Sequence, residues 1–306
     1  MRLVTRSDFD GLVCAMILKE AKLIDEIKFV HPKDVQDGKV ELSKNDITTN
    51  LPYDSRVYLC FDHHESELTR NKEMRDNDNW YIDGDAKSAA RVVYNYYKDK
   101  YSLDRISDEI MTAVDKGDSA DFTKEEILDP KDWVLMNFLM DARTGLGRFH
   151  DFRISNYDLM MELIDYCVEH SIEDVLQLPD VKERVDLYFE QADRFKKQLE
   201  EISSVHGKVV LVDQKSVDTI YAGNRFMIYA MYPEAEISIH VAWGFKKQNT
   251  AVMIGKSIIN RSSSFNIGDL CLKYGGGGHA NAGTCQIDND QIDQILPQII
   301  EEINRG

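Results

Sequence analysis

The stretch RVYLCFDHH, residues 56–64, reads as an apolar strand that ends in one carboxylate and two imidazoles. Branched and aromatic side chains over Arg56–Phe61 favour a buried strand. Asp62, His63 and His64 follow at its carboxyl end. Mixed carboxylate and imidazole ligands suit manganese, iron or zinc better than calcium. This stretch alone leaves two interpretations open: a metal site, or a capping aspartate followed by two surface histidines.

Two further acidic stretches lie on either side of it. SDFDG, residues 7–11, follows a predicted strand and precedes a predicted helix over residues 12–21. Asp8 and Asp10 alternate along this loop, so both carboxylates can turn toward one cation. Asp115, in MTAVDKGDSADF, follows an apolar helical stretch. Solvated loop acids and helix-end acids are the other interpretations of these residues.

The order of elements predicts an α/β protein. Short apolar runs alternate with helical patterns in the N-terminal half, which favours a mainly parallel sheet flanked by helices. Ligands of such sheets bind beyond the carboxyl ends of the strands, where SDFDG and DHH both fall. A helical pattern over residues 182–202 and a new strand at 208–213 predict three segments. They are an N-terminal domain over 1–182, a linker helix over 183–206 and a smaller α/β domain over 207–306.

Composition narrows the class of protein. The chain has 306 residues, enough for two domains, and a formal net charge of −17. An acidic chain lacks the basic face that grips long duplex nucleic acid. Its five cysteines are scattered without a CxxC pair, which is typical of reduced thiols in a cytoplasmic protein. No signal peptide and no membrane span is expected, because no apolar stretch approaches 18 residues.

A glycine run near the C-terminus stands in a basic stretch. GGGGH, residues 275–279, exposes backbone amides that can approach an anion, and His279 can donate to a phosphate oxygen. Residues 240–280 carry five basic side chains and one acidic one, a net +4, which leaves −21 elsewhere. Together with Arg261 and the serines after it, the run predicts a phosphate-binding surface. A plain flexible turn is the alternative.

SDFDG, DHH and GGGGH in this order resemble the DHH phosphoesterase family with its DHH-associated C-terminal domain, most of all the exopolyphosphatase-related branch. The resemblance implies an N-terminal domain that binds divalent cations, usually Mn²⁺ with Mg²⁺ as an option, and a C-terminal domain that binds substrate. Carried over by position, the metal ligands are Asp8, Asp10, Asp62, His63 and Asp115. The catalytic residues are Asp62, His63 and His64, and the substrate-binding residues are Arg6, Arg261, Gly276, Gly277, Gly278 and His279.

Two positions depart from the family pattern. Arg6 stands where many relatives carry a metal-binding histidine. Relatives also carry an aspartate at the end of the strand before the DHH strand, and the best register of NDITTNLPY puts Asn50 there, with Asp46 as the alternative. Arginine cannot bind a metal ion, but its fork of donors suits phosphate. The site is therefore expected to hold one or two ions.

The resemblance implies a metal-dependent phosphoesterase that hydrolyses a phosphodiester or phosphoanhydride. Its expected partner is a small phosphorylated substrate: a short single-stranded oligonucleotide, a nucleotide or polyphosphate. Neither duplex nucleic acid nor a membrane is expected as a partner, and a homodimer is an option. The two departures motivate an alternative, a degenerate relative that binds a phosphate or nucleotide without cleaving it.

Overall fold

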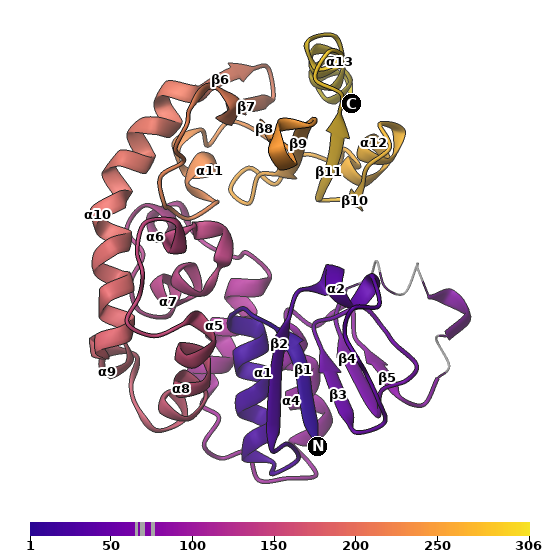
Figure 1. Cartoon of the computed structure of the whole chain (residues 1–306), viewed down its shortest axis with the longest axis vertical. Coiled ribbons are helices and arrows are strands. Elements are labelled where there is room, and N and C mark those ends of the chain that lie inside the picture. The colour runs from indigo at the N-terminus through magenta and orange to yellow at the C-terminus, as the bar shows by residue number, and fades with distance from the viewer. Residues whose placement is uncertain (65–66, 68–70, 75–76) are drawn as a thin grey trace. The chain divides into compact units, whose positions relative to one another are not determined.

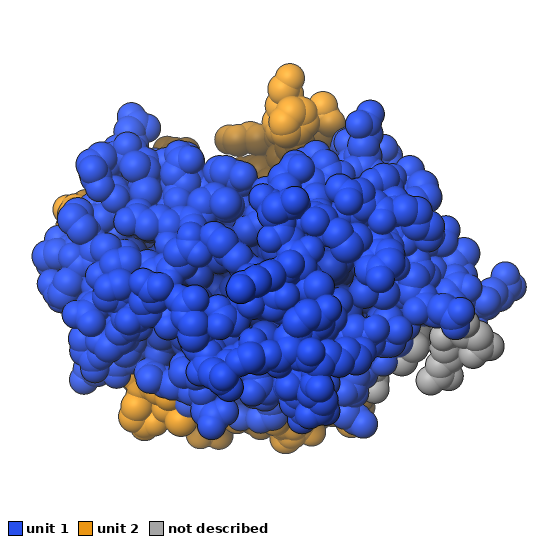
Figure 2. All heavy atoms as spheres, turned by 90° about the horizontal axis from the view of Figure 1, so that it is seen from below, with its two compact units in different colours: residues 1–121, 130–142, 146–187 blue, residues 122–129, 143–145, 188–306 orange. Residues whose placement is uncertain are grey.

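The computed structural model describes residues 1–64, 67, 71–74 and 77–306. The chain forms two compact units, which are described separately below. Unit 1 comprises residues 1–121, 130–142 and 146–187, and unit 2 comprises residues 122–129, 143–145 and 188–306 (Figure 2). Short segments of the middle of the chain thus join the C-terminal unit. The predicted domain boundaries at residues 182 and 206 stay a prediction.

Unit 1 is built on a five-stranded parallel sheet (Figure 1). Its strands run in the order β2-β1-β3-β4-β5 and pair in parallel throughout. Because β1 lies between β2 and β3, the chain turns in opposite directions from β1, and such a switch point opens a crevice at the carboxyl edge. The predicted α/β class is confirmed. The strand bounds are β1 Arg2–Arg6, β2 Glu26–Val30, β3 Asp46–Thr49, β4 Leu59–Asp62 and β5 Trp80–Ile82.

Helices cover one face of this sheet with a large apolar core. Leu3 and Phe61 pack there against the fully buried helix residues Leu12 and Met160. A smaller core on other strand residues, including Val4 and Cys60, lies against the segment that contains α2. The α-helices in the described part of unit 1, before the long helix α10, are α1 Phe9–Glu20, α2 Pro32–Gln36, α4 Ala89–Tyr97, α5 Asp108–Asp118, α7 Asp132–Met140, α8 Asn156–Glu169 and α9 Ile172–Gln177.

A long helix, α10 (Pro179–Ile202), runs from unit 1 into unit 2. It lies over the residues for which the sequence predicts a connecting helix, although it begins three residues earlier than the predicted pattern. Its buried residues Tyr188, Phe195 and Leu199 follow the helical spacing that the sequence showed.

Unit 2 contains a mixed six-stranded sheet in the order β10-β11-β9-β8-β7-β6. Only the β7–β8 pair is parallel among its described pairs. Residues such as Ile239, Val252 and Ile299 form its core. The strands are β6 Ser203–His206, β7 Val209–Asp213, β8 Ile237–Trp243, β9 Thr250–Lys256, β10 Gly277–His279 and β11 Ala282–Ile287. The helices are α6 Lys124–Leu128, α11 Met227–Met231, α12 Ile267–Lys273 and α13 Ile292–Arg305.

All five cysteines are buried free thiols. None of the helices in the described part of the chain is both long and apolar enough to cross a membrane.

Candidate active site

The first component of the site is the turn that follows β1. Asp8 caps α1, and its Oδ1 accepts a hydrogen bond from the Gly11 amide at 3.0 Å. A Cβ on Gly11 would lie 2.0 Å from the Arg6 carbonyl oxygen, so only glycine fits this tight entry. The Arg6 Nε lies 2.8 Å from Asp8 Oδ2. Burial raises the pKa of Asp8, although the Arg6 guanidinium opposes the shift. A cationic side chain therefore already lies against the first predicted ligand.

Asp10 is held by the start of α4. Its carboxylate is 3% exposed and accepts hydrogen bonds from the amides of Ala89, at 3.1 Å, and Ala90, at 2.8 Å. These amides are unpaired donors of a helix N-terminus, whose partial positive charge favours a carboxylate. Burial, Asp118 and Asp8 together raise the pKa of Asp10 well above its usual value. A carboxylate crowded in this way binds a cation readily, because a cation removes the repulsion.

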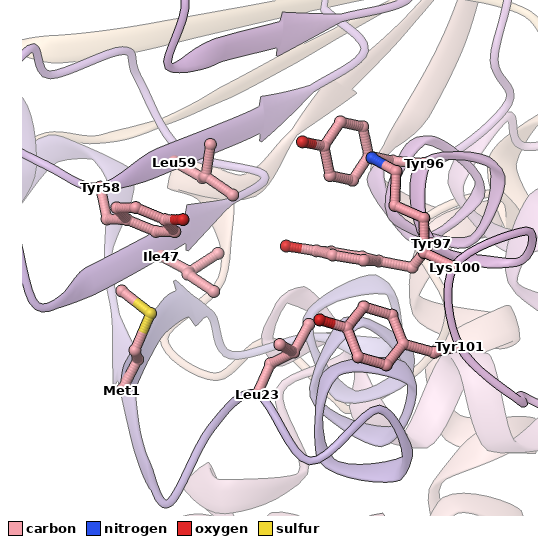
Figure 3. A pocket seen from close by; sticks show the side chains of 9 residues that line it. All are labelled: Met1, Leu23, Ile47, Tyr58, Leu59, Tyr96, Tyr97, Lys100 and Tyr101. Atoms are coloured by element: carbon pink, nitrogen blue, oxygen red, sulfur yellow. The ribbon is translucent and has the colours of Figure 1, made fainter.

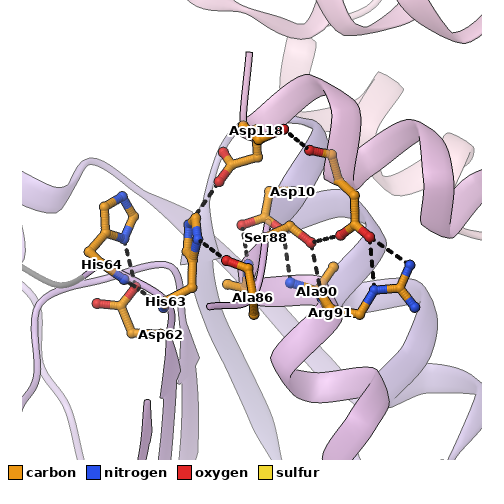
Figure 4. A network of polar contacts seen from close by, with 12 residues as sticks. Asp10, Asp62, His63, His64, Ala86, Ser88, Ala90, Arg91 and Asp118 are labelled. Carbon is orange, nitrogen blue, oxygen red and sulfur yellow. Dashed lines mark hydrogen bonds and ion pairs between the residues drawn. The ribbon is translucent and has the colours of Figure 1, made fainter. Parts of the chain in front are cut away.

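The DHH segment leaves β4 with its aspartate buried and its histidines half-buried. Asp62 Oδ1 accepts a hydrogen bond from the His63 amide at 2.8 Å and lies 2.7 Å from His64 Nδ1. His63 Nδ1 lies 3.2 Å from the Ala86 carbonyl oxygen, which can only accept (Figure 4). The proton of a neutral His63 therefore sits on Nδ1, which leaves the lone pair of Nε2 available to a metal ion.

Asp118 completes a cluster that the sequence did not single out as a ligand set. Its Oδ2 lies 2.8 Å from His63 Nε2 (Figure 4). Ligand atoms of Asp10, His63 and Asp118 all lie within 4.8 Å of one another, as do those of Asp62, His63 and His64. Burial opposes the charge of His63, but the acids around it, Asp118 first, raise its pKa to about 9. A proton on His63 therefore offsets the negative charge of these acids when no metal is bound. A divalent ion would offset the same charge.

Asp115 lies elsewhere, although it was predicted as a ligand. It sits one turn before Asp118 on α5, and its carboxylate pairs with Arg91 Nη2 at 2.6 Å and with Ser88 Oγ at 2.7 Å. Ser88 in turn caps α4 by accepting a hydrogen bond from the Arg91 amide. The structure does not bring Asp115 into either group of metal-binding atoms. It places this aspartate behind the helix start that holds Asp10.

Asn50 is the second departure from the family pattern. It follows β3 at the level where Arg6 ends β1 and Asp62 ends β4, as the strand register shows. Its side chain is 2% exposed, and neither its Oδ1 nor its Nδ2 has a hydrogen-bond partner among the described residues. Its φ is +55°, a conformation that asparagine tolerates better than most residues. A buried amide without a partner is costly, so it points to a ligand or an ordered water.

The predicted phosphate-binding residues lie in unit 2. Half of the glycine run is strand β10, which pairs with β11 in an antiparallel ladder. A Cβ on Gly276 would lie 2.2 Å from the Thr284 carbonyl oxygen, and one on Gly278 would lie 2.3 Å from the Ala282 carbonyl oxygen. The alternative of a plain flexible turn therefore does not describe this run. His279 Nδ1 accepts a hydrogen bond from the Asn281 amide, and Arg261 Nε donates to the Ile258 carbonyl oxygen.

Comparisons with known proteins find similar solved structures. No family model matches the chain, and no curated protein matches it. Among solved structures, the pGpG-specific phosphodiesterase PggH of Vibrio cholerae is 55% identical. The match covers 99% of each chain with a TM-score of 0.84.

Two more distant structures share the fold. The DHH domain of a protein described as a member of a ribosomal-protein family is 13% identical over 99% of this chain and 86% of that one, with a TM-score of 0.55. Mg²⁺-bound RecJ of Thermus thermophilus is 12% identical over 100% of this chain and 50% of that one, with a TM-score of 0.50.

Proposed function

Because the chain belongs to the DHH phosphoesterase family, we propose that it hydrolyses the phosphodiester bond of a short oligonucleotide, with pGpG as its substrate. The class of reaction, metal-dependent hydrolysis of a phosphate ester, follows from the 55% identity to a phosphodiesterase over the whole chain. Hydrolysis of pGpG adds one water across the internal phosphodiester and releases two molecules of guanosine monophosphate (GMP). Polyphosphate, the other class that the sequence suggested, stays a prediction.

The observation that carries the proposal is the cluster of Asp10, His63 and Asp118. Two carboxylates and one imidazole, a donor set that suits manganese, converge in a partly buried, acidic place. Both groups of metal-binding atoms share His63, whose Nδ1 already faces a carbonyl oxygen. A single imidazole nitrogen binds a single ion, so His63 can serve one ion at a time. The guanidinium of Arg6 already offsets part of the negative charge of Asp8. We therefore infer one firmly held divalent ion per chain, with manganese as the preferred metal.

The ion would lower the pKa of a bound water and offset charge on the phosphoryl oxygens. Arg6, at the same edge of the sheet, would hold a phosphate oxygen with the N–H groups that do not face Asp8. His64 donates its Nδ1 proton toward Asp62, and its side chain is 41% exposed. That arrangement leaves Nε2 as the ring nitrogen that can exchange a proton with the reacting groups. Arg261 and Gly276–His279 remain the predicted phosphate-binding groups of unit 2.

The test is turnover of pGpG with Mn²⁺ and with Mg²⁺, beside a panel of a longer oligonucleotide, a 3′,5′-bisphosphate nucleoside and polyphosphate. Asp118→Asn removes a proposed ligand, and Asp121→Asn removes an exposed acid three residues later as the matched control. We expect loss of turnover and of bound Mn²⁺ in the first variant only. Elemental analysis of the wild-type protein should give one manganese per chain.

Two results would overturn the proposal. The first is a metal-loaded protein that leaves pGpG intact. The second is binding of pGpG that needs no divalent ion and persists in Asp62→Ala, which is the behaviour of the non-catalytic alternative. A cytoplasmic location and a homodimer stay predictions.

A further inference from the structure

A cavity of about 380 Å³ opens at the amino-terminal ends of the strands of unit 1. Ile47, near the start of β3, and Leu59, the first residue of β4, form part of its wall, whereas Asn50 and Asp62 follow or end the same strands. The cavity is therefore separate from the candidate active site. Its lining, drawn in Figure 3, is Met1, Leu23, Ile47, Tyr58, Leu59, Tyr96, Tyr97, Lys100 and Tyr101.

Tyrosine rings dominate this wall. Tyr96, Tyr97 and Tyr101 come from the end of α4 and the turn after it, and Tyr58 comes from the residue before β4. Figure 3 shows the hydroxyl groups of Tyr58 and Tyr97 pointing toward each other across the cavity. Among the described residues, none is hydrogen bonded to these two hydroxyls or to that of Tyr101. Flat faces with hydroxyl groups at their edges suit a planar ligand that carries its own donors and acceptors.

One side chain gives the cavity a charge. Of its nine lining residues, all of them described, Lys100 has the one charged side chain. Its Nζ lies 3.3 Å from the centre of the Tyr96 ring, so the ammonium group rests on the aromatic wall. Tyr58 and Tyr101 are 50% and 40% exposed, which leaves the mouth of the cavity open to a ligand from solution. An anionic group on that ligand would find its partner in Lys100.

We propose that this cavity binds a nucleoside monophosphate. The base lies against the tyrosine rings, its polar edge bonds to the hydroxyl groups of Tyr58 and Tyr97, and the phosphate pairs with Lys100. The volume falls within the range of small-molecule sites, about 300–1,000 Å³. The choice of a nucleotide among aromatic anions rests on the proposed function, because hydrolysis of a dinucleotide releases nucleoside monophosphates.

The test separates this cavity from the active site. GMP is titrated by calorimetry into the Asp62→Ala variant in the presence of EDTA, where the active site holds no metal. We expect one GMP per chain. In the same background, Lys100→Ala should weaken binding about tenfold or more, because it removes a charge-assisted bond. Lys98→Ala, which removes an exposed lysine two residues earlier and outside the cavity, should leave binding unchanged.

Surface substitutions keep the test independent of folding. Tyr58→Ala alters a half-exposed side chain and should weaken GMP binding as Lys100→Ala does, with an unchanged thermal unfolding curve. The proposal is overturned if GMP and AMP both fail to bind the Asp62→Ala protein, or if Lys98→Ala weakens binding as much as Lys100→Ala. It is also overturned if Tyr58→Ala dissociates a dimer while no nucleotide binds, since the cavity would then belong to an interface between copies. Failure of the proposed function would appear separately, as absence of pGpG turnover by the wild-type enzyme.

Discussion

The two edges of the parallel sheet in unit 1 are chemically opposite. At the carboxyl edge, Asp10 and Asp62 are almost fully buried beside a half-buried imidazole. At the amino edge, the same strands begin among tyrosine and aliphatic side chains with a single lysine. Burying like charges together costs several kcal/mol per ion unless a counter-ion compensates. The carboxyl edge therefore carries a cost that protonated His63 and the Arg6 guanidinium offset in part and that a bound cation would offset further, whereas the lining of the amino-edge cavity buries no such group of like charges.

The largest effect on catalysis is expected from a substitution of Asp62 at the carboxyl edge. Asp62→Ala removes the carboxylate that accepts from the His63 main-chain amide and faces His64 Nδ1. We expect kcat for pGpG to fall by about a thousandfold or more, since metal binding and proton transfer both depend on these groups. Steady-state kinetics in excess Mn²⁺ measures this. A loss below tenfold would show that the DHH segment is not the catalytic centre.

A smaller effect is expected from Asp115, which lies behind the proposed metal ligands. Asp115→Ala leaves Arg91 and Ser88 without their carboxylate partner at the start of α4. Because α4 donates the amides that hold Asp10, we expect Mn²⁺ affinity to fall about 10–100-fold. Asp118→Ala serves as the contrast, since it should abolish binding. Equal losses in the two variants would instead make Asp115 a metal ligand, as the sequence predicted.

The pH dependence of metal affinity and of stability gives a further test of the carboxyl edge. The pKa of His63 is raised to about 9, so the metal-free protein keeps this proton at neutral pH. A metal must displace it, and its affinity should rise up to about tenfold per pH unit between pH 6 and 8. The contribution of His63 to the stability of the metal-free protein should instead fall as the pH rises. The raised pKa stabilises the fold fully below about pH 6.5, and this contribution is lost as the pH rises through about 9.

Two measurements check this prediction. Calorimetry in buffers of different ionisation enthalpy should detect a proton released for each ion bound. Thermal unfolding of the metal-free protein should report the stability trend. A metal affinity independent of pH over this range would contradict the assignment of His63 as a ligand.

The smallest effects are expected from one substitution at each edge of the sheet, and the quantity compared is the Tm. Asp8→Asn keeps the helix cap, because asparagine caps as well as aspartate. It removes a carboxylate whose pKa is raised by burial, so its charge costs stability at neutral pH. We expect a higher Tm for the metal-free variant.

Tyr97→Phe removes a hydroxyl that bonds to no described residue at the amino edge, and its Tm should stay within about 1 °C of wild type. Scanning calorimetry distinguishes the two. A lower Tm for Asp8→Asn would mean that the pair with Arg6 outweighs the burial cost.

Much of the carboxyl edge was predictable because its signals are local. An apolar strand followed at once by polar residues predicts which edge of the sheet those residues occupy. Asp8, Asp10, Asp62 and His63 were placed at one edge in this way, and the structure brings them there. Asp118 was not selected as a ligand. It lies one turn from Asp115 on α5, so spacing alone does not separate the two acids, and a helix-end pair offers no further signal.

The sequence by itself determined the alternation of strands and helices, and with it the parallel sheet and the edge at which its acids gather. Each of these features follows from residues that lie close together in the sequence. Tertiary structure alone decided which acid meets His63, because Arg91 from α4 pairs with Asp115 and leaves Asp118 to the cluster. It also decided that Tyr58 meets tyrosines some forty residues later around one cavity. Such contacts depend on how elements pack, and no local pattern in the chain encodes that packing.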